Sequence, residues 1–230
     1  MIKAIIFDMG GVLVKDPGDQ RKKLFAKLLG VSVEEFESAY RQLIDDFQKG
    51  NISDMEFWEK IADILSIDKK KMPNLKDIWY DSLIPIFTED KEVFEVVDEL
   101  KRNKYLVALL SNTEKPTIKY VETLDYSMFD IKIYSCEIGM IKPDAEIYVY
   151  TLDKLGIKAE EAVLIDDKDI NIDGAEELGM KTILFKNAKQ MKKELLKLGV
   201  KAEVEGFLWL IFLITLSSTS TISSSLKTFI

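Results

Sequence analysis

The stretch AIIFDMGGVLV at residues 4–14 decides the fold of this chain. Four apolar residues lead directly into Asp8, and Gly10 and Gly11 follow it, which is the pattern of a buried strand that ends in a turn. The carboxylate of Asp8 then projects from the end of that strand. Such an Asp can attack phosphorus and form an aspartyl-phosphate, or it can cap the turn, and this segment alone favours neither.

Further apolar runs later in the chain predict an α/β fold. Strand-like runs alternate with helical patterns in the second half of the chain, which is typical of a Rossmann-like, doubly wound parallel sheet. The predicted strands are residues 3–7, 104–110, 162–165 and 181–185. The predicted helices between them are residues 143–155, with Pro143 at the start and Gly156 just past the end, and 169–178, followed by Gly179.

Residues 17–85 break this alternation and predict an inserted helical cap. Amphipathic stretches occur at 20–29, 33–48 and 53–65, and the second and third begin with the capping-box pairs Ser32 with Glu35 and Ser53 with Glu56. A helical insertion after the first strand would lie over the carboxyl ends of the sheet. Its aromatic residues Phe47, Trp58 and Trp79 either line a pocket or form the core of the insertion, as aromatic residues at helical spacing more often do.

We therefore divide the chain into a Rossmann-like catalytic core at 1–16 and 86–203, a helical cap at 17–85 and an atypical tail at 204–230. The tail has an apolar run at 207–216 followed by a tract rich in Ser and Thr. This run is roughly half of the ~20 residues that a membrane-spanning helix needs. We expect no stable membrane span.

Composition excludes several functions. The 230 residues include 32 Lys and Arg against 40 Asp and Glu, and the net charge of −8 argues against general binding of nucleic acids. The chain has no His, which rules out His nucleophiles and His-rich zinc sites. The single Cys136 cannot form an intramolecular disulfide, and strand-like sequence begins at Lys3, so we expect no signal peptide and a cytoplasmic protein.

Two further segments carry groups that bind anions. Ser111, Asn112 and Thr113 follow a predicted strand and precede a helix that begins near Lys115, so their polar groups could form a phosphate seat at a helix N-terminus or an ordinary helix cap. Lys142 lies in GMIKPD (139–144), before a helix start. It is either a solvated surface charge or a partner of phosphate and a nucleophilic Asp.

An acidic group follows the strand that ends in VLI (163–165). Asp166, Asp167, Asp169 and Asp173 occur within eight residues, with Asn171 among them. Clustered carboxylates repel one another unless solvent or a cation relieves them, and an oxygen-rich set suits Mg²⁺. A solvated first helical turn explains Asp169 and Asp173 equally well.

These four segments, in this order, resemble the haloacid dehalogenase-like hydrolase superfamily over roughly residues 1–200. The segments FDMGGVLV, LSNT, GMIKPDAEIY and IDDKDINIDGAEELG resemble the motifs of one branch of this superfamily. That branch holds α-D-glucose-1-phosphate phosphatase and the N-terminal phosphatase domain of epoxide hydrolases.

The resemblance implies an Mg²⁺-dependent phosphatase that acts on a small phosphate monoester, such as a sugar phosphate. It implies Asp8 as nucleophile and metal ligand, and the backbone carbonyl of Gly10 as a second ligand. Ser111, Asn112 and Lys142 would bind the phosphate. Asp167 would be the remaining metal ligand, with Asp166 as the alternative and Asn171 in the last acidic position of the motif.

Gly10 is a departure, because most phosphatases of this family carry a second Asp there as general acid and base. Asp16 and Asp19 are candidates for that role. A non-catalytic protein that binds a phosphate ligand or a partner is the alternative function. A dehalogenase is less favoured because its pattern lacks the acidic pair, and a phosphomutase needs the missing Asp. We expect a monomer or homodimer whose partner is a small phosphorylated metabolite.

Overall fold

The computed structural model describes residues 1–15, 18–68 and 78–202. A five-stranded sheet lies at its centre, with the strand order β3-β2-β1-β4-β5. Every neighbouring pair in the sheet is parallel. The strands are β1 (Ala4–Phe7), β2 (Leu106–Ser111), β3 (Ile131–Tyr134), β4 (Ala162–Asp166) and β5 (Lys181–Leu184). The parallel α/β fold that the sequence predicts is confirmed.

Strand β3 is the one strand of this sheet that our sequence analysis missed. It lies at the edge of the sheet beside β2, and its sequence IKIY has only four residues, one of them charged. Lys132 is exposed, whereas Ile133 and Tyr134 are buried. A four-residue edge strand with a charged residue lacks the continuous apolar run of a strand buried on both faces.

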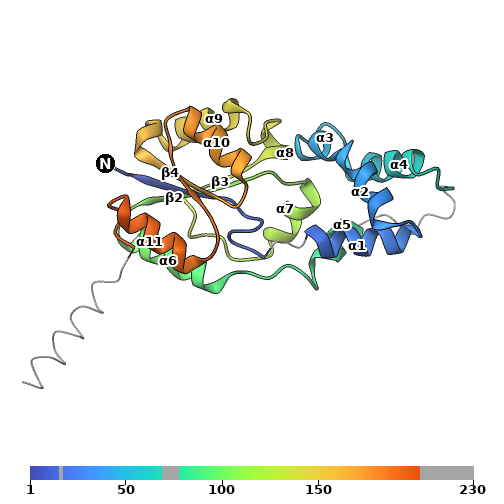
Figure 1. Ribbon diagram of the computed structural model, residues 1–230, viewed down its shortest axis with the longest axis horizontal. Coiled ribbons are helices and arrows are strands. Elements are labelled where there is room, and N and C mark those ends of the chain that lie inside the picture. The colour runs from blue at the N-terminus through green and yellow to red at the C-terminus, as the bar shows by residue number, and fades with distance from the viewer. Residues whose placement is uncertain (16–17, 69–77, 203–230) are drawn as a thin grey trace, which may run out of the picture.

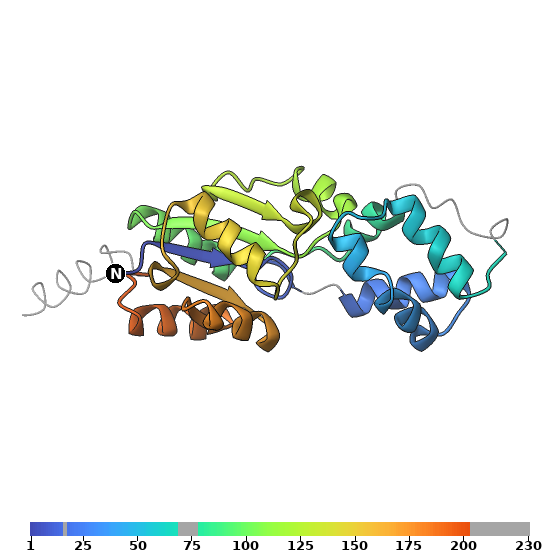
Figure 2. The same ribbon diagram turned by 90° about the horizontal axis from the view of Figure 1, so that it is seen from above.

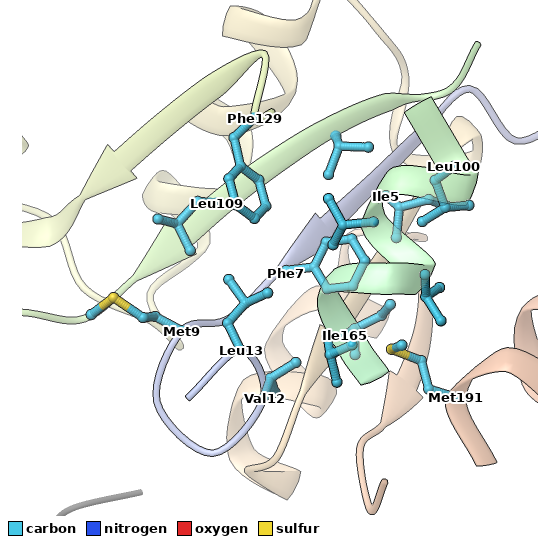
Figure 3. Close-up of a cluster of buried hydrophobic side chains, with 14 of the residues drawn as sticks. Ile5, Phe7, Met9, Val12, Leu13, Leu100, Leu109, Phe129, Ile165 and Met191 are labelled. Carbon is cyan, nitrogen blue, oxygen red and sulfur yellow. The ribbon is translucent and has the colours of Figure 1, made fainter. Parts of the chain in front are cut away.

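Helices cover both faces of the sheet (Figure 1). Along β1, Ile5 and Phe7 pack into one cluster and Ile6 packs into another, because successive side chains of a strand point to opposite faces. Helices α6 (Lys91–Arg102) and α11 (Ala188–Lys197) cover the face of Phe7 (Figure 3). Helices α9 (Ala145–Leu155) and α10 (Asp169–Glu177) cover the other face. The alternation of strand and helix thus builds three layers.

The helical insertion forms a second body beyond the carboxyl ends of the strands (Figure 2). It has its own apolar core, in which Phe25, Phe36, Phe47, Trp58 and Trp79 are at most 2% exposed. Its helices are α1 (Gly18–Leu29), α2 (Val33–Arg41), α3 (Ile44–Gln48), α4 (Asp54–Ile64) and α5 (Ile78–Leu83). Three short helices of the sheet body remain: α7 (Lys115–Val121), α8 (Ser135–Ile138) and a 3₁₀ turn (Ala159–Glu161).

Two sequence expectations for this insertion have clear outcomes. Both capping boxes are present, at Ser32 with Glu35 and at Ser53 with Glu56. The predicted helix over 33–48 is instead two helices, α2 and α3, separated at 42–43. The break lets Phe47 stack on Phe57 inside the insertion, with ring centroids 4.5 Å apart, while the next residue of α3 reaches the sheet body.

In the described ranges, no helix is both long enough and apolar enough to cross a bilayer. The apolar run at 207–216 and the rest of the predicted tail lie outside the described residues.

The close contact between α9 and α10 predicts a packing effect at Gly174. A Cβ atom there would lie 2.7 Å from the carbonyl oxygen of Pro143, which is backbone that cannot swing aside. Overpacking of this kind costs about 1–3 kcal/mol, more than the ~1 kcal/mol that Ala gains over Gly in a helix. Gly174→Ala is expected to lower the free energy of unfolding in urea, whereas exposed Glu177→Ala on the same helix should not. Equal stability of the two variants would contradict this packing.

Candidate active site

Asp8 lies at the point where β1 ends, at the edge of the sheet that faces the helical insertion. Its backbone N–H donates to the carbonyl of Ile165 at 2.9 Å, which continues the pairing of β1 with β4 by one residue. The side chain is only 6% exposed and lines a pocket of about 470 Å³. Strand β1 therefore leads directly into Asp8, whose carboxylate faces this pocket.

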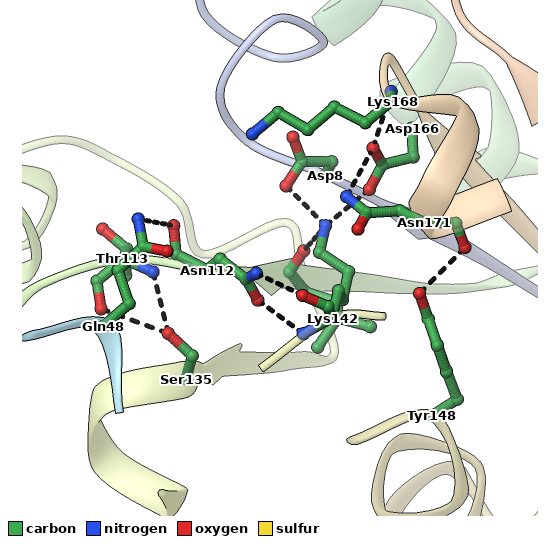
Figure 4. Close-up of polar contacts among 11 residues, drawn as sticks. Asp8, Gln48, Asn112, Thr113, Ser135, Lys142, Tyr148, Asp166, Lys168 and Asn171 are labelled. Carbon is green, nitrogen blue, oxygen red and sulfur yellow. Dashed lines mark hydrogen bonds and ion pairs between the residues drawn. The ribbon is translucent and has the colours of Figure 1, made fainter. Parts of the chain in front are cut away.

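Lys142 holds this carboxylate in place (Figure 4). Its ammonium lies 2.7 Å from Asp8 Oδ1 and 2.6 Å from Asp166 Oδ2, and it donates to the carbonyl of Leu110 at 3.0 Å. These acceptors sit at the ends of β1, β4 and β2. All three N–H groups of the ammonium are therefore occupied, and Lys142 is 3% exposed. Of the two roles weighed for Lys142, the structure shows the pairing with Asp8.

Asn112 fixes the backbone of Lys142 from the loop after β2. Its Oδ1 accepts from the Lys142 N–H and its Nδ2 donates to the Lys142 carbonyl, both at 2.8 Å. This pair of bonds ties two segments 30 residues apart, so Asn112 sets where the ammonium can reach. Both polar atoms of the Asn112 side chain are therefore bonded to the backbone of Lys142.

Asp166 is fully buried and both of its oxygens are occupied. Oδ2 faces Lys142, and Oδ1 accepts from the backbone of Lys168 at 3.0 Å and from Asn171 Nδ2 at 2.9 Å. The carbonyl of Asn171 in turn accepts from the hydroxyl of Tyr148 at 2.8 Å. Asp166 is thus part of the framework that holds Lys142.

Asp167 completes a group of three carboxylates. Asp8, Asp166 and Asp167 each place one oxygen within 4.8 Å of the others, which is close enough for one metal ion. Gly11 has φ +86° and lies against Asp167, where any Cβ would overlap Oδ2. Asp169 and Asp173 lie on α10, exposed to solvent and outside this group. The tertiary structure therefore selects three of the five acidic residues that the sequence offers.

Electrostatics within the group follow from burial. Desolvation raises the pKa of Asp8 to about 6, against the opposing effect of Lys142 and with smaller contributions from Asp166 and Asp167. Burial alone would lower the pKa of Lys142, but the carboxylates of Asp8 and Asp166 outweigh it and the pKa is raised. The ammonium therefore stays charged, and Asp8 titrates closer to neutral pH than an ordinary carboxyl group.

The phosphate seat predicted after β2 is formed only in part. Ser111 is 2% exposed and lines the pocket, and its hydroxyl has no hydrogen-bond partner among the described residues. The N–H of Thr113 donates to Ser135 Oγ at 2.8 Å and is not directed to a ligand. Ser111 therefore remains the available donor of this segment.

The insertion contributes side chains to the pocket that sequence reasoning missed. They are Arg21, Lys22, Tyr40, Ile44, Asp45 and Gln48, and from the loop after β2 also Glu114. Of the two roles weighed for Phe47, Trp58 and Trp79, the structure shows the second, because they fill the insertion's own core and do not line the pocket. Asp19 is exposed and does not line the pocket, and Asp16 lies outside the described residues. No local pattern marks the lining residues, because only the packing of the insertion over the sheet brings them there.

Comparison with known proteins agrees with this fold and site. The model of the haloacid dehalogenase-like hydrolase family matches residues 2–179. The chain belongs to this family, as the resemblance of its four motifs predicted.

Similar proteins include phosphatases. The chain is 27% identical to D-ribitol-5-phosphate phosphatase of Bacteroides thetaiotaomicron, over 85% of this chain and 97% of that protein. Drimenol cyclase of Aspergillus calidoustus is 24% identical over 85% of this chain, and bifunctional epoxide hydrolase 2 of Mus musculus is 45% identical over 30% of it. The chain spans only 36% and 12% of the lengths of these two proteins.

A solved structure of similar shape is that of a HAD family enzyme from Bacteroides thetaiotaomicron in complex with magnesium and inorganic phosphate. It has a TM-score of 0.66 and 29% identity, over 81% of this chain and 96% of that one. A dehalogenase structure with 21% identity and a TM-score of 0.56 shows a likeness of fold alone.

The buried ammonium predicts a pH-dependent stability effect. Lys142→Met leaves the carboxylates of Asp8 and Asp166 buried without their cation, and breaking a buried ion pair costs about 3–5 kcal/mol. We expect that loss in urea unfolding at pH 8 with EDTA. At pH 5 the loss should be smaller, because protonation removes the charge of Asp8. Lys193→Met, at an exposed position of α11, is the control, and an equal effect of the two variants at pH 8 would contradict the ion-pair network.

Proposed function

We propose that this protein is a Mg²⁺-dependent phosphatase that hydrolyses a small phosphate monoester through an aspartyl-phosphate on Asp8. One observation carries the proposal. A carboxylate at a strand end is held by a buried ammonium, with two further carboxylates within 4.8 Å, and it opens into a pocket beside Ser111. Nucleophile, charge compensation and anion-binding hydroxyl are the parts that phosphoryl transfer requires.

The donor set fits Mg²⁺. It consists of carboxylate oxygens, which this hard cation prefers, and Gly11 leaves room for Asp167 beside the turn after β1. Because both oxygens of Asp166 are occupied by Lys142, Lys168 and Asn171, we assign the ligands to Asp8 and Asp167. Asp166 then orients Lys142. Gly10, which lines the pocket beside Asp8, would add its backbone carbonyl.

The proposed reaction has two steps, in which Asp8 and then water attack phosphorus. A carboxylate oxygen of Asp8 attacks phosphorus, the bond from phosphorus to the ester oxygen breaks, and that oxygen leaves with a proton as an alcohol. Water then hydrolyses the aspartyl-phosphate, which releases inorganic phosphate and restores Asp8. Lys142 holds Asp8 in line, and Ser111 donates to a phosphoryl oxygen. Bound Mg²⁺ would supply positive charge that stabilises the phosphoryl oxygens.

The pocket lining supports a polar leaving group, such as a sugar or polyol. The polar side chains of Arg21 and Asp45 line the same pocket as Asp8. The relative that matches over 97% of its length is named a D-ribitol-5-phosphate phosphatase. Among the described residues, Asp45 and Glu114 are the carboxyl groups other than Asp8 that line this pocket, and Asp45 becomes the candidate proton donor in place of Asp19.

Hydrolysis of p-nitrophenyl phosphate tests the proposal, because this leaving group needs little acid assistance. Turnover is expected with Mg²⁺, with a loss in EDTA and a loss of roughly 10³-fold or more in Asp8→Asn, which lacks the nucleophile. Exposed Asp173→Asn should keep the wild-type rate. Folded wild type that binds a phosphate ester without turnover would indicate the non-catalytic alternative instead.

The raised pKa of Asp8 predicts how the protein binds Mg²⁺. A metal ligand must be deprotonated, and with a pKa of about 6 only roughly one-tenth of Asp8 is ionised at pH 5. Calorimetric titration with Mg²⁺ should therefore show an apparent Kd about tenfold higher at pH 5 than at pH 7.5. Asp8→Asn should remove this pH dependence together with most of the affinity. An equal Kd for wild type at both pH values would contradict the assignment of Asp8 as a ligand.

A further inference from the structure

Glu114 is a buried carboxylate that the proposed chemistry does not use. It follows Thr113 in the loop after β2 and is 2% exposed, yet it lines the pocket. Gln48 of the insertion donates from one amide nitrogen to Glu114 Oε1 at 2.9 Å and to the carbonyl of Asn112 at 3.3 Å. The side-chain amide nitrogen of Gln48 thus donates to two residues of the loop after β2, and its position beside Asn112 can be followed in Figure 4.

The other oxygen of Glu114 accepts from Thr117 of α7, a residue that contacts a second helix of the insertion. Thr117 Oγ1 donates to Glu114 Oε2 at 3.1 Å and accepts from the indole N–H of Trp79 at 3.0 Å. Trp79 is fully buried in the insertion's core. Glu114 therefore binds α3 directly through Gln48 and orients Thr117, whose hydroxyl binds α5 through Trp79.

Further contacts hold α3 at the same junction. Lys49 forms an ion pair of 3.4 Å with Asp144, which lies two residues after Lys142. Gly50, with φ +72°, packs so closely on α8 that a Cβ would overlap the carbonyl of Cys136. The junction is therefore tight, and Glu114 is buried in it, whereas Lys49 and Asp144 are partly exposed.

We propose that Glu114 is the positioning residue that docks the insertion over Asp8. This inference rests on the proposed function, because docking matters there by placing Arg21 and Asp45 beside the leaving group. The alternative role for Glu114 is that of the missing general acid. A carboxyl group that accepts hydrogen bonds at both oxygens directs no proton into the pocket, so the geometry favours docking.

A swap of the two partners tests this role. Gln48→Glu places two carboxylates opposite each other, and their repulsion should release α3 from the sheet body. Misplacement of the pocket residues is expected to lower kcat/KM for a sugar phosphate such as ribitol 5-phosphate roughly 10- to 100-fold. Adding Glu114→Gln restores a donor and an acceptor at the same place, and the double variant should recover most of the loss.

Two readouts separate docking from damage to the fold. The inhibition constant for inorganic phosphate should stay within about twofold of wild type in all variants, because Ser111 and Lys142 are untouched. Hydrogen exchange of α3 and α5 amides should become faster in Gln48→Glu and slow again in the double variant, without change in β2. Gln42→Glu, the same change at an exposed position of the insertion, should alter neither the inhibition constant for phosphate nor the exchange rates of α3 and α5.

The outcomes are distinct. Unchanged exchange in Gln48→Glu, failure of the swap to reverse it, or a raised inhibition constant for phosphate would overturn the docking role. Absence of turnover in wild type would overturn the proposed function, whereas the exchange experiment would still decide whether Glu114 docks the insertion.

Discussion

The buried ammonium of Lys142 is the interaction on which the rest of the site depends. It joins Asp8, Asp166 and the carbonyl of Leu110 at the ends of three neighbouring strands. Removal of any one of these charges from water is costly, and each is tolerated there because the others offset it. The ammonium therefore compensates for the proximity of Asp8 and Asp166, and it sets the direction in which Asp8 faces the pocket.

In this network the neighbouring residues Asp166 and Asp167 have different contacts. Asp166 is fully enclosed and committed to Lys142 and Asn171, whereas Asp167 lies beside Gly11 at the turn after β1. Two adjacent carboxylates thus have different surroundings, because successive residues at the end of a strand point to opposite sides. The same alternation puts Phe7 into the apolar core and Asp8 above it.

The helical insertion completes the site by polar contacts at long range. Its own core is apolar, around Phe25, Trp58 and Trp79, and Tyr120 of α7 packs against it. Its attachment to the sheet body includes the bonds of Gln48, Thr117 and Trp79 around Glu114. The junction therefore combines hydrogen bonds with the ring contact of Tyr80 on Tyr120.

The sequence by itself determined the parallel α/β fold, the helical insertion and the four segments that meet at the pocket. These features are local, because apolar runs form strands, capping boxes start helices, and the strands end at or next to Asp8, Ser111 and Asp166. It missed β3, whose edge position leaves no continuous apolar run. Only the tertiary structure decided that Asp166 supports Lys142, that Asp169 and Asp173 stand apart, and that Gln48 meets Glu114. These two pairs of residues are 24 and 66 positions apart in the sequence, and only the packing of separate elements brings them into contact.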